Sequence, residues 1–74
     1  MIEKILDVIA SRANVDRNKI TSSTNILDLD VDSLDVLNIV MDVEYMFNVR
    51  FEDEEIIELR TAEDIENILT KKFS

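Results

Sequence analysis

Cysteine and histidine are both absent from this chain of 74 residues. Without cysteine the chain can form neither a disulfide framework nor a thiolate metal site. Without histidine it lacks the usual general base of enzymes and the commonest zinc ligand. No apolar run approaches the roughly 18 residues of a membrane span, and the opening stretch MIEKILDVIA mixes charges into its apolar positions, unlike a secretory signal. We therefore expect a soluble cytoplasmic protein that does not insert into a membrane.

Basic residues are scarce as well, with 8 Lys and Arg against 17 Asp and Glu and a net charge of −9. Fourteen of the acids and only two arginines lie between Asp28 and Glu66, so this segment carries −12 and the rest of the chain +3. Nucleic acid and anionic membranes are unfavourable partners for such a surface. A protein with a basic patch is favoured, through faster encounter and a defined orientation. The alternative is that the acids only keep a small domain soluble.

Apolar residues make up 46% of the sequence, which is enough for a packed core in a single domain spanning residues 1–74. The apolar positions from Ile2 to Ile9 recur at helical spacing and predict a first helix that ends near residues 12–14. Residues 14–32 are rich in Asn, Asp, Ser and Thr, and we expect a long loop packed across the core. Its apolar anchors are Val15, Ile20, Ile26, Leu27 and Leu29.

A second helix is predicted to begin at Ser33, because Asp32 is a good N-cap and Asp35 stands at the third helical position, as in a capping box. Its core-facing row consists of Val36, Ile39, Val40, Val43 and Phe47. A second apolar row, rotated away from the first, consists of Leu34, Leu37 and Met41. A helix with two apolar rows is either deeply buried or faces both a core and a partner.

The last third of the chain predicts two more helices. A short one is expected around Glu54 to Glu58, and Thr61 is expected to cap a final helix with Asp64 at its third position. The expected fold is all-α, a small four-helix bundle with three main helices, a short third helix and a long loop between the first two.

Four aspartates surround a single serine in LDLDVDSLDVL, residues 27–37. A calcium loop of the EF-hand type that started at Asp28 would have acids at its first, third and fifth positions, as this stretch does. Such a loop also requires glycine at the sixth position and glutamate at the twelfth, but Ser33 and Ile39 stand there. We therefore expect no specific metal site, and only loose binding of divalent cations to the acids stays open.

Ser33 lacks the partners that a serine nucleophile requires. Its hydroxyl is not deprotonated at neutral pH, and activation takes an adjacent base. The chain has no histidine, and the nearby aspartates are poor bases for so weak an acid. Ser33 is therefore a better candidate for a residue that accepts a group than for a catalyst.

The stretch LDLDVDSLDVLNIVMDVEYMF resembles the modification region of acyl carrier proteins. In that family an Asp-Ser-Leu triplet at the start of the second helix carries 4′-phosphopantetheine, and Asp32, Ser33 and Leu34 match it. The resemblance covers nearly the whole chain and includes the stretches EDEE and TAEDI. Other matching positions are Val15, Ile20, Leu29, Val40, Met41, Glu44 and Phe47. The chain departs from the usual pattern at Asp30 (usually Gly), Tyr45 (often acidic) and Glu52 (usually Pro).

The resemblance implies that the protein is a carrier and not an enzyme, with no catalytic residue of its own. It also implies that Ser33 receives phosphopantetheine from a separate transferase, with coenzyme A as the donor. The thiol of the attached arm would then carry acyl groups as thioesters between enzymes of fatty acid or related lipid or polyketide biosynthesis. The expected partners of a monomeric carrier are this transferase and acyl-processing enzymes with basic docking patches. The residues expected to dock them are Asp32, Leu34, Asp35, Leu37, Met41, Glu44, Glu54 and Glu55.

Two other functions stay open. The cargo could be an aminoacyl unit, as on a D-alanyl or peptidyl carrier. From a different class, the chain could be an acidic helical interaction module that is never modified. Incubation with coenzyme A and a transferase separates a carrier of either cargo from the unmodified module, because only a carrier gains mass.

Overall fold

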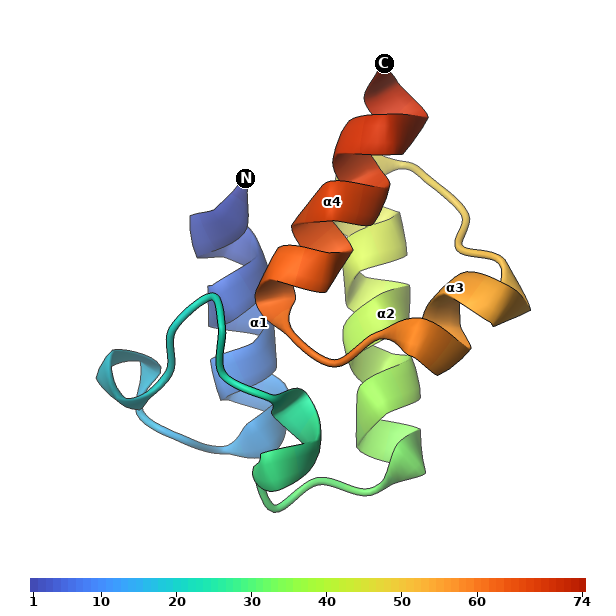
Figure 1. Cartoon of the computed structure of the whole chain (residues 1–74). Coiled ribbons are helices and arrows are strands. Elements are labelled where there is room, and N and C mark those ends of the chain that lie inside the picture. Colours follow the sequence, from blue (N-terminus) through green and yellow to red (C-terminus); the bar gives the residue numbers. More distant parts are fainter.

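Four α-helices account for most of the chain in the computed structural model, which describes residues 1–74 and contains no strand. They are α1 (Ile2–Ala13), α2 (Ser33–Phe47), α3 (Asp53–Glu58) and α4 (Ala62–Phe73). In Figure 1, α1 runs in the opposite direction to α2 and α4, and both chain ends lie at the same end of the molecule. The expected all-α bundle with a short third helix is confirmed.

The starts of α2 and α4 are fixed by local hydrogen bonds, as expected. The Asp32 carboxylate accepts the Asp35 N–H at 2.9 Å, and the Asp35 carboxylate accepts the Asp32 N–H at 3.2 Å. Thr61 and Asp64 form the same reciprocal pair at the start of α4, at 3.1 and 3.0 Å. Each box satisfies two N–H groups around a helix start, so these two helices begin where the sequence predicts.

The ends of α1 and α2 show how a chain without glycine closes a helix. Asn14 and Asn48 follow these helices with φ values of 56° and 55°, in the left-handed region. Glycine is the usual residue at such a position, and asparagine tolerates it better than most other residues. The first helix ends within the predicted range.

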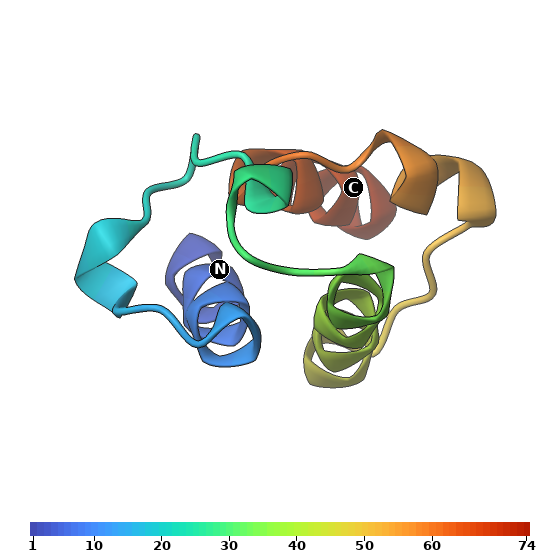
Figure 2. The ribbon, with the colours of Figure 1, turned by 90° about the horizontal axis from the view of Figure 1, so that it is seen from below.

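The core lies between α1, α2 and α4, and α3 closes one side (Figure 2). The inner row of α2 faces it, with Ile39, Val40 and Val43 buried and Val36 and Phe47 partly buried. The buried side chains that the other elements contribute to this core cluster are Ile5, Leu6, Ile9, Ala10, Ile20, Ile26, Phe51, Leu59, Ala62, Ile65 and Leu69.

None of the helices combines the length and the apolar character needed to cross a membrane.

The long loop between α1 and α2 packs across the core, as predicted, and contains two short 3-10 turns, Arg17–Lys19 and Ile26–Asp28. Ile20 and Ile26 are buried, but the prediction for Leu27 was wrong, because this side chain is 52% exposed. Successive residues of a 3-10 turn point about 120° apart, so Ile26 and Leu27 cannot both face the core.

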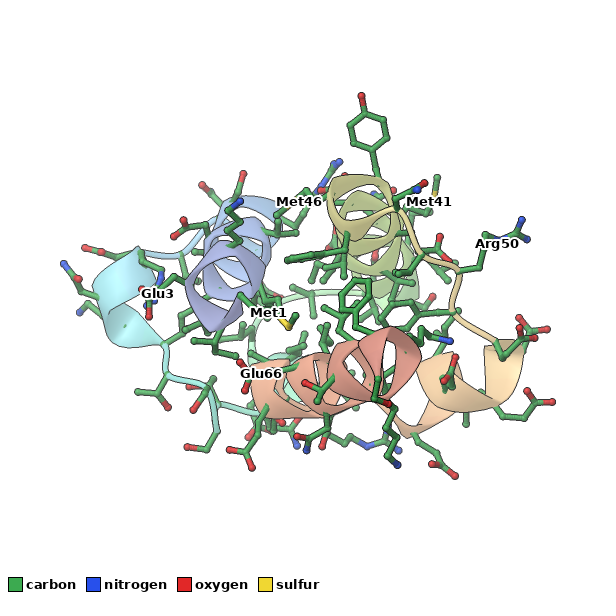
Figure 3. All side chains as sticks on the ribbon, turned by 90° about the horizontal axis from the view of Figure 1, so that it is seen from above. Met1, Glu3, Met41, Met46, Arg50 and Glu66 are labelled. Atoms are coloured by element: carbon green, nitrogen blue, oxygen red, sulfur yellow. The ribbon has the colours of Figure 1, made fainter.

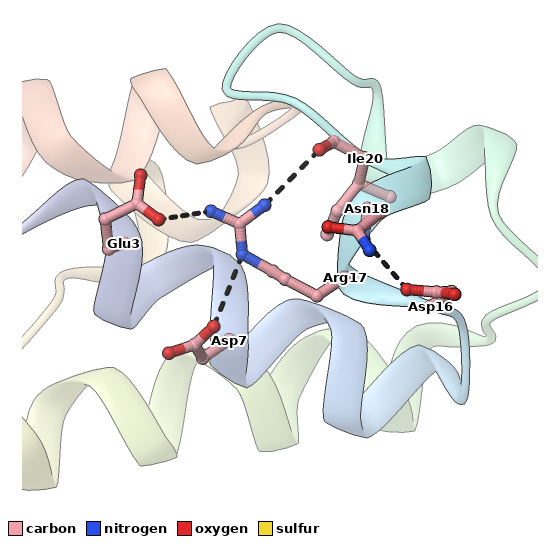
Figure 4. A network of polar contacts seen from close by, with 6 residues as sticks. All are labelled: Glu3, Asp7, Asp16, Arg17, Asn18 and Ile20. Carbon is pink, nitrogen blue, oxygen red and sulfur yellow. Dashed lines mark hydrogen bonds and ion pairs between the residues drawn. The ribbon is translucent and has the colours of Figure 1, made fainter.

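Arg17 fastens the first part of this loop to α1 (Figure 4). Its Nη2 donates to Glu3 Oε1 at 2.7 Å, and its Nε lies 3.3 Å from Asp7 Oδ1. Its Nη1 also donates to the Ile20 carbonyl at 3.5 Å. The arginine thereby neutralises two acids of α1 and holds the loop where Ile20 enters the core.

The second part of the loop is tied to the segment that leads into α4. The Ile26 N–H donates to the Arg60 carbonyl at 2.7 Å, and the Glu63 N–H donates to the Ser22 carbonyl at 3.1 Å. Asn25 and Thr61 form an isolated antiparallel bridge between the same two segments. These bonds fix the residues between α3 and α4 relative to the loop that delivers the start of α2.

Candidate functional site

Ser33 is the first residue of α2 and is exposed to solvent. The capping box between Asp32 and Asp35 fixes the backbone on both sides of it. The Ser33 hydroxyl forms no hydrogen bond within the chain, although both neighbouring acids do. Ser33 therefore combines a backbone held by local hydrogen bonds with an exposed hydroxyl that has no partner within the chain.

Ser33 also lines a pocket of about 290 Å³ between the start of α2, α3 and the two adjoining loops. Seven further residues line it, and only one of these, Arg60, is polar or charged. The six apolar residues are Leu27, Val36, Leu37, Ile56, Ile57 and Leu59. An apolar chain attached at Ser33 would therefore have an apolar surface within reach, and burying it there would be favourable.

The second apolar row of α2 is exposed along the helix that begins at Ser33. Leu34, Leu37 and Met41 keep 63%, 45% and 60% of their surface exposed. Tyr45, one turn further along, is 90% exposed. Figure 3 shows the Met41 side chain pointing away from the other helices. A contiguous apolar row at the surface of a small domain is typical of a site that contacts a partner.

Two of the acids predicted to dock partners have a structural role in this fold. The Glu44 carboxylate accepts the Phe51 N–H at 2.8 Å and so ties α2 to the chain beyond it. The Glu55 carboxylate accepts the Glu52 N–H at 2.7 Å and lies 3.0 Å from Lys72 Nζ of α4. These contacts, the backbone hydrogen bond first, lower the pKa of Glu55 below its ordinary value. Both side chains are only partly exposed.

Of the other three predicted docking acids, two also have structural contacts and one has none. Asp32 and Asp35 each accept a hydrogen bond from the other's backbone N–H in the capping box, although Asp32 is exposed. Glu54 is exposed and has neither a hydrogen bond nor an ion pair within the chain. Among the five acids, Glu54 alone has no hydrogen bond or ion pair from its carboxylate to another residue of the chain.

An ion pair joins the flanks of α1 and α2 at a distance from Ser33 along the helix. Arg12 Nε and Nη2 donate to the two carboxylate oxygens of Asp42 at 2.7 and 3.0 Å. Hydrogen bonding by Arg12 lowers the pKa of Asp42, and the same bond raises the pKa of Arg12. This bidentate geometry fixes the register of the two helices rather than serving the surface around Ser33.

The aspartates of the LDLDVDSLDVL stretch do not come together around a common point. No three acidic side chains anywhere in the chain are placed so that they could hold a metal ion. The acids at 32 and 35 are occupied by backbone N–H groups, and Asp28 and Asp30 are exposed.

Six of the residues that line the Ser33 pocket were not predicted as part of a functional site: Leu27, Val36, Ile56, Ile57, Leu59 and Arg60. Ile57 is 70% exposed, and a lone exposed isoleucine on a short acidic helix carries no local signal. The Arg60 backbone at the pocket is bound by the long loop, since its carbonyl accepts the Ile26 N–H. Such juxtapositions arise from tertiary packing, which no local sequence pattern records.

Comparison with known proteins finds relatives over nearly the whole chain. The model of a family described as "Phosphopantetheine attachment site" matches residues 3–69, a span that includes Ser33. An acyl carrier protein of Syntrophobacter fumaroxidans is 44% identical, over 92% of this chain and 85% of that protein. An acyl carrier protein of Petrotoga mobilis is 33% identical over 100% of this chain and 88% of its own length. One of Aster yellows witches'-broom phytoplasma is 37% identical over 100% and 99%.

Proposed function

The chain belongs to the family of phosphopantetheine attachment domains, and we propose that Ser33 is the residue to which its phosphopantetheine is attached. The chain is a carrier of acyl groups, as its acyl carrier protein relatives indicate, and this supports the proposal that it has no catalytic activity of its own. The covalently attached 4′-phosphopantetheine supplies a terminal thiol, which holds an acyl group as a thioester.

The observation that carries the assignment to Ser33 is its setting. Its hydroxyl is exposed and free of hydrogen bonds at the first position of a capped helix. It shares a pocket with six apolar side chains and one arginine, a lining that suits a group with a phosphate at one end and an apolar cargo at the other. The residues present therefore fit the implied group.

We propose that a separate transferase attaches the group. The Ser33 oxygen forms a new bond to the phosphorus next to the pantetheine of coenzyme A, and the bond between the two phosphates breaks. Adenosine 3′,5′-bisphosphate leaves, and a base of the transferase takes the serine proton. This division of labour follows from the chain itself, because it has no histidine and the acids beside Ser33 are engaged with backbone N–H groups.

The exposed row of α2 is the proposed docking surface for this transferase and for the acyl-processing enzymes. Leu34, Leu37 and Met41 begin directly beside Ser33, so a partner that covers them has the modified residue at the edge of its footprint. The acids provide the complement for a basic patch on the partner. The docking acids of this proposal are Asp32, Asp35, Glu44, Glu54 and Glu55. Asp35, Glu44 and Glu55 stay partly exposed despite their structural contacts.

The same proposal covers the setting in which the carrier works. Residues 1–74 act as one carrier domain, as a monomer and in the cytoplasm, and the cargo belongs to fatty acid or related biosynthesis. An aminoacyl cargo remains the alternative within the carrier class, and the pocket favours the acyl cargo because its wall contains no acid that would pair with an amino group.

Mass spectrometry of the intact chain tests the assignment. Incubation with coenzyme A and a phosphopantetheinyl transferase is expected to add one phosphopantetheine, and peptide mapping should place it on Ser33. Ser33→Ala should abolish the addition without loss of helicity, because Ser33 fills no part of the core. Ser11→Ala, which removes another exposed helical serine, should leave it intact. Unmodified wild-type protein, or modification at Ser22 or Ser23, would overturn the proposal.

A further inference from the structure

Arg60 is the one charged side chain among the residues that line the Ser33 pocket. It stands between α3 and α4 within the segment of the chain that carries fourteen acids and two arginines. The other arginine of that segment is Arg50, which lies in the connection between α2 and α3 and points outward (Figure 3). A single cation beside a free serine hydroxyl, in a chain of net charge −9, calls for an explanation.

The Arg60 backbone is held on both sides. Its N–H donates to Asp64 Oδ2 at 3.0 Å, and its carbonyl accepts the Ile26 N–H at 2.7 Å. The side chain is held as well, because Nη1 donates to the carbonyls of Ile57 and Leu59, both at 2.8 Å. The guanidinium is therefore positioned before any ligand arrives, and ordering it on binding would lose little entropy.

No carboxylate neutralises this guanidinium. Arg12 and Arg17 both pair with acids, but no carboxylate oxygen lies within 4.0 Å of a guanidinium nitrogen of Arg60. Its Nε and Nη2 have no hydrogen-bond partner in the chain. These two nitrogens form one edge of the planar group, the geometry that binds two oxygens of a phosphate at once.

We propose that Arg60 is a positioning residue that binds the phosphate of the phosphopantetheine attached at Ser33. The phosphodiester is an anion at neutral pH, and it is joined to a residue that lines the same pocket as Arg60. Its pairing with the Nε–Nη2 edge directs the rest of the arm toward the apolar wall formed by α3. This inference rests on the proposed function of Ser33 and adds a role for a residue outside the Asp-Ser-Leu triplet.

A purely structural role for Arg60 predicts a different behaviour. The two bonds from Nη1 close the end of α3, and their loss would destabilise the chain equally with and without the attached group. A phosphate contact adds stability only in the modified chain. The difference between the two forms therefore separates the roles.

The experiment compares unmodified and modified chains of the wild type, Arg60→Gln, Arg60→Lys and the control Arg50→Gln, which removes the other arginine of the acidic segment. Intact mass first establishes that each variant carries one phosphopantetheine, and peptide mapping establishes that it is attached at Ser33. We then measure the ³¹P chemical shift and relaxation of the phosphodiester, the Nε–Hε signal of Arg60, and the melting temperature of both forms.

Modification of the wild type should shift the Arg60 Nε–Hε signal, and Arg60→Gln should move the ³¹P signal to the position and sharpness of a freely solvated phosphodiester. Arg60→Gln should also lower the melting temperature more in the modified than in the unmodified chain. Arg60→Lys should restore part of this, with greater sensitivity to salt, and Arg50→Gln should match the wild type. Modified protein whose ³¹P signal ignores Arg60→Gln overturns this inference alone, whereas a chain that gains no phosphopantetheine overturns the proposed function as well.

Discussion

Helix α2 has two apolar faces of similar composition, of which one is buried in the core and the other is exposed to solvent. The inner face buries Ile39, Val40 and Val43 almost completely, whereas Leu34 and Met41 on the outer face keep 63% and 60% of their surface exposed. Both faces lie on one rigid helix that begins at Ser33. The inner face stabilises the bundle by burying apolar surface. The outer face leaves apolar surface in contact with water, which is unfavourable in the isolated chain.

This difference shows that stability and recognition are separated on α2. A side chain of the inner face contributes to the free energy of unfolding and has no access to a partner. A side chain of the outer face contributes little to folding, so its apolar character is explained by what it contacts when a partner is present. Because the two faces consist of different side chains, residues of one face can be substituted while the other face stays intact.

The largest effect is expected from a truncation of the inner face. Ile39→Ala should lower the free energy of unfolding by about 2–5 kcal/mol, because it removes buried methyl groups and leaves a cavity. In a domain of this size that corresponds to a loss of ~8 °C or more in melting temperature. Thermal and urea unfolding measure it. A loss as small as that of a surface substitution would show that the inner face does not hold the bundle.

The matched truncation on the outer face should act on binding instead. Met41→Ala should change the free energy of unfolding by less than about 0.5 kcal/mol. It should speed dissociation from the transferase by about fivefold or more, because a desolvated apolar contact is lost. Surface plasmon resonance with an inactive transferase gives both rate constants. If Met41→Ala destabilises the fold and leaves dissociation unchanged, the separation between the two faces is wrong.

A charge reversal at Glu54 tests the electrostatic part of docking. Glu54 is exposed and unpaired in the chain, so Glu54→Lys should spare the fold and slow association with the transferase while leaving dissociation nearly unchanged. Raising salt should reduce the wild-type association rate toward that of the variant, because screening shortens the reach of surface charges to about 10 Å at 0.1 M. An association rate independent of both salt and Glu54 would assign the acids to solubility alone.

The smallest effect concerns the flank of α2, where Asp42 pairs with Arg12. The pKa of Asp42 is lower in the folded chain than in the unfolded chain, so the pair stabilises the fold above the unfolded value and loses this effect as pH falls through the folded value. Asp42→Asn should therefore melt slightly below the wild type at pH 7, and the gap should close in acid, below about pH 4. Melting curves across pH measure the gap. A gap that persists at low pH would show that packing, not ionisation, is what Asp42 contributes.

Local features of the sequence predicted the helix starts and the two faces of α2, because caps and apolar periods depend on residues only three or four positions apart. The capping boxes at Asp32 and Thr61 show this. The choice between neighbouring anchors was harder, and Leu27 turned outward while Ile26 turned in. Contacts between distant residues, such as Glu55 with Lys72, have no local signature.

The candidate site was predictable to a similar extent. The Asp-Ser-Leu triplet predicts Ser33, and the helical spacing predicts the row of apolar residues that follows it. The pocket was not predictable, because it forms where α3 and the long loop meet the start of α2. Arg60 is held there by contacts that include its backbone bond to Ile26, a residue far from it in the sequence.

The central claim is that the chain holds acyl groups through a group attached at Ser33, and loading of the modified chain tests it most directly. Modified wild-type protein is offered a fatty acid with an acyl-loading ligase, or an amino acid with an aminoacyl-loading enzyme, and intact mass is recorded before and after neutral hydroxylamine. We predict one added acyl group with the ligase, its removal by hydroxylamine as expected for a thioester, retention of the phosphopantetheine, and no loading of Ser33→Ala. An acyl group that resists hydroxylamine, equal loading of Ser33→Ala, or loading with the amino acid alone would contradict the account.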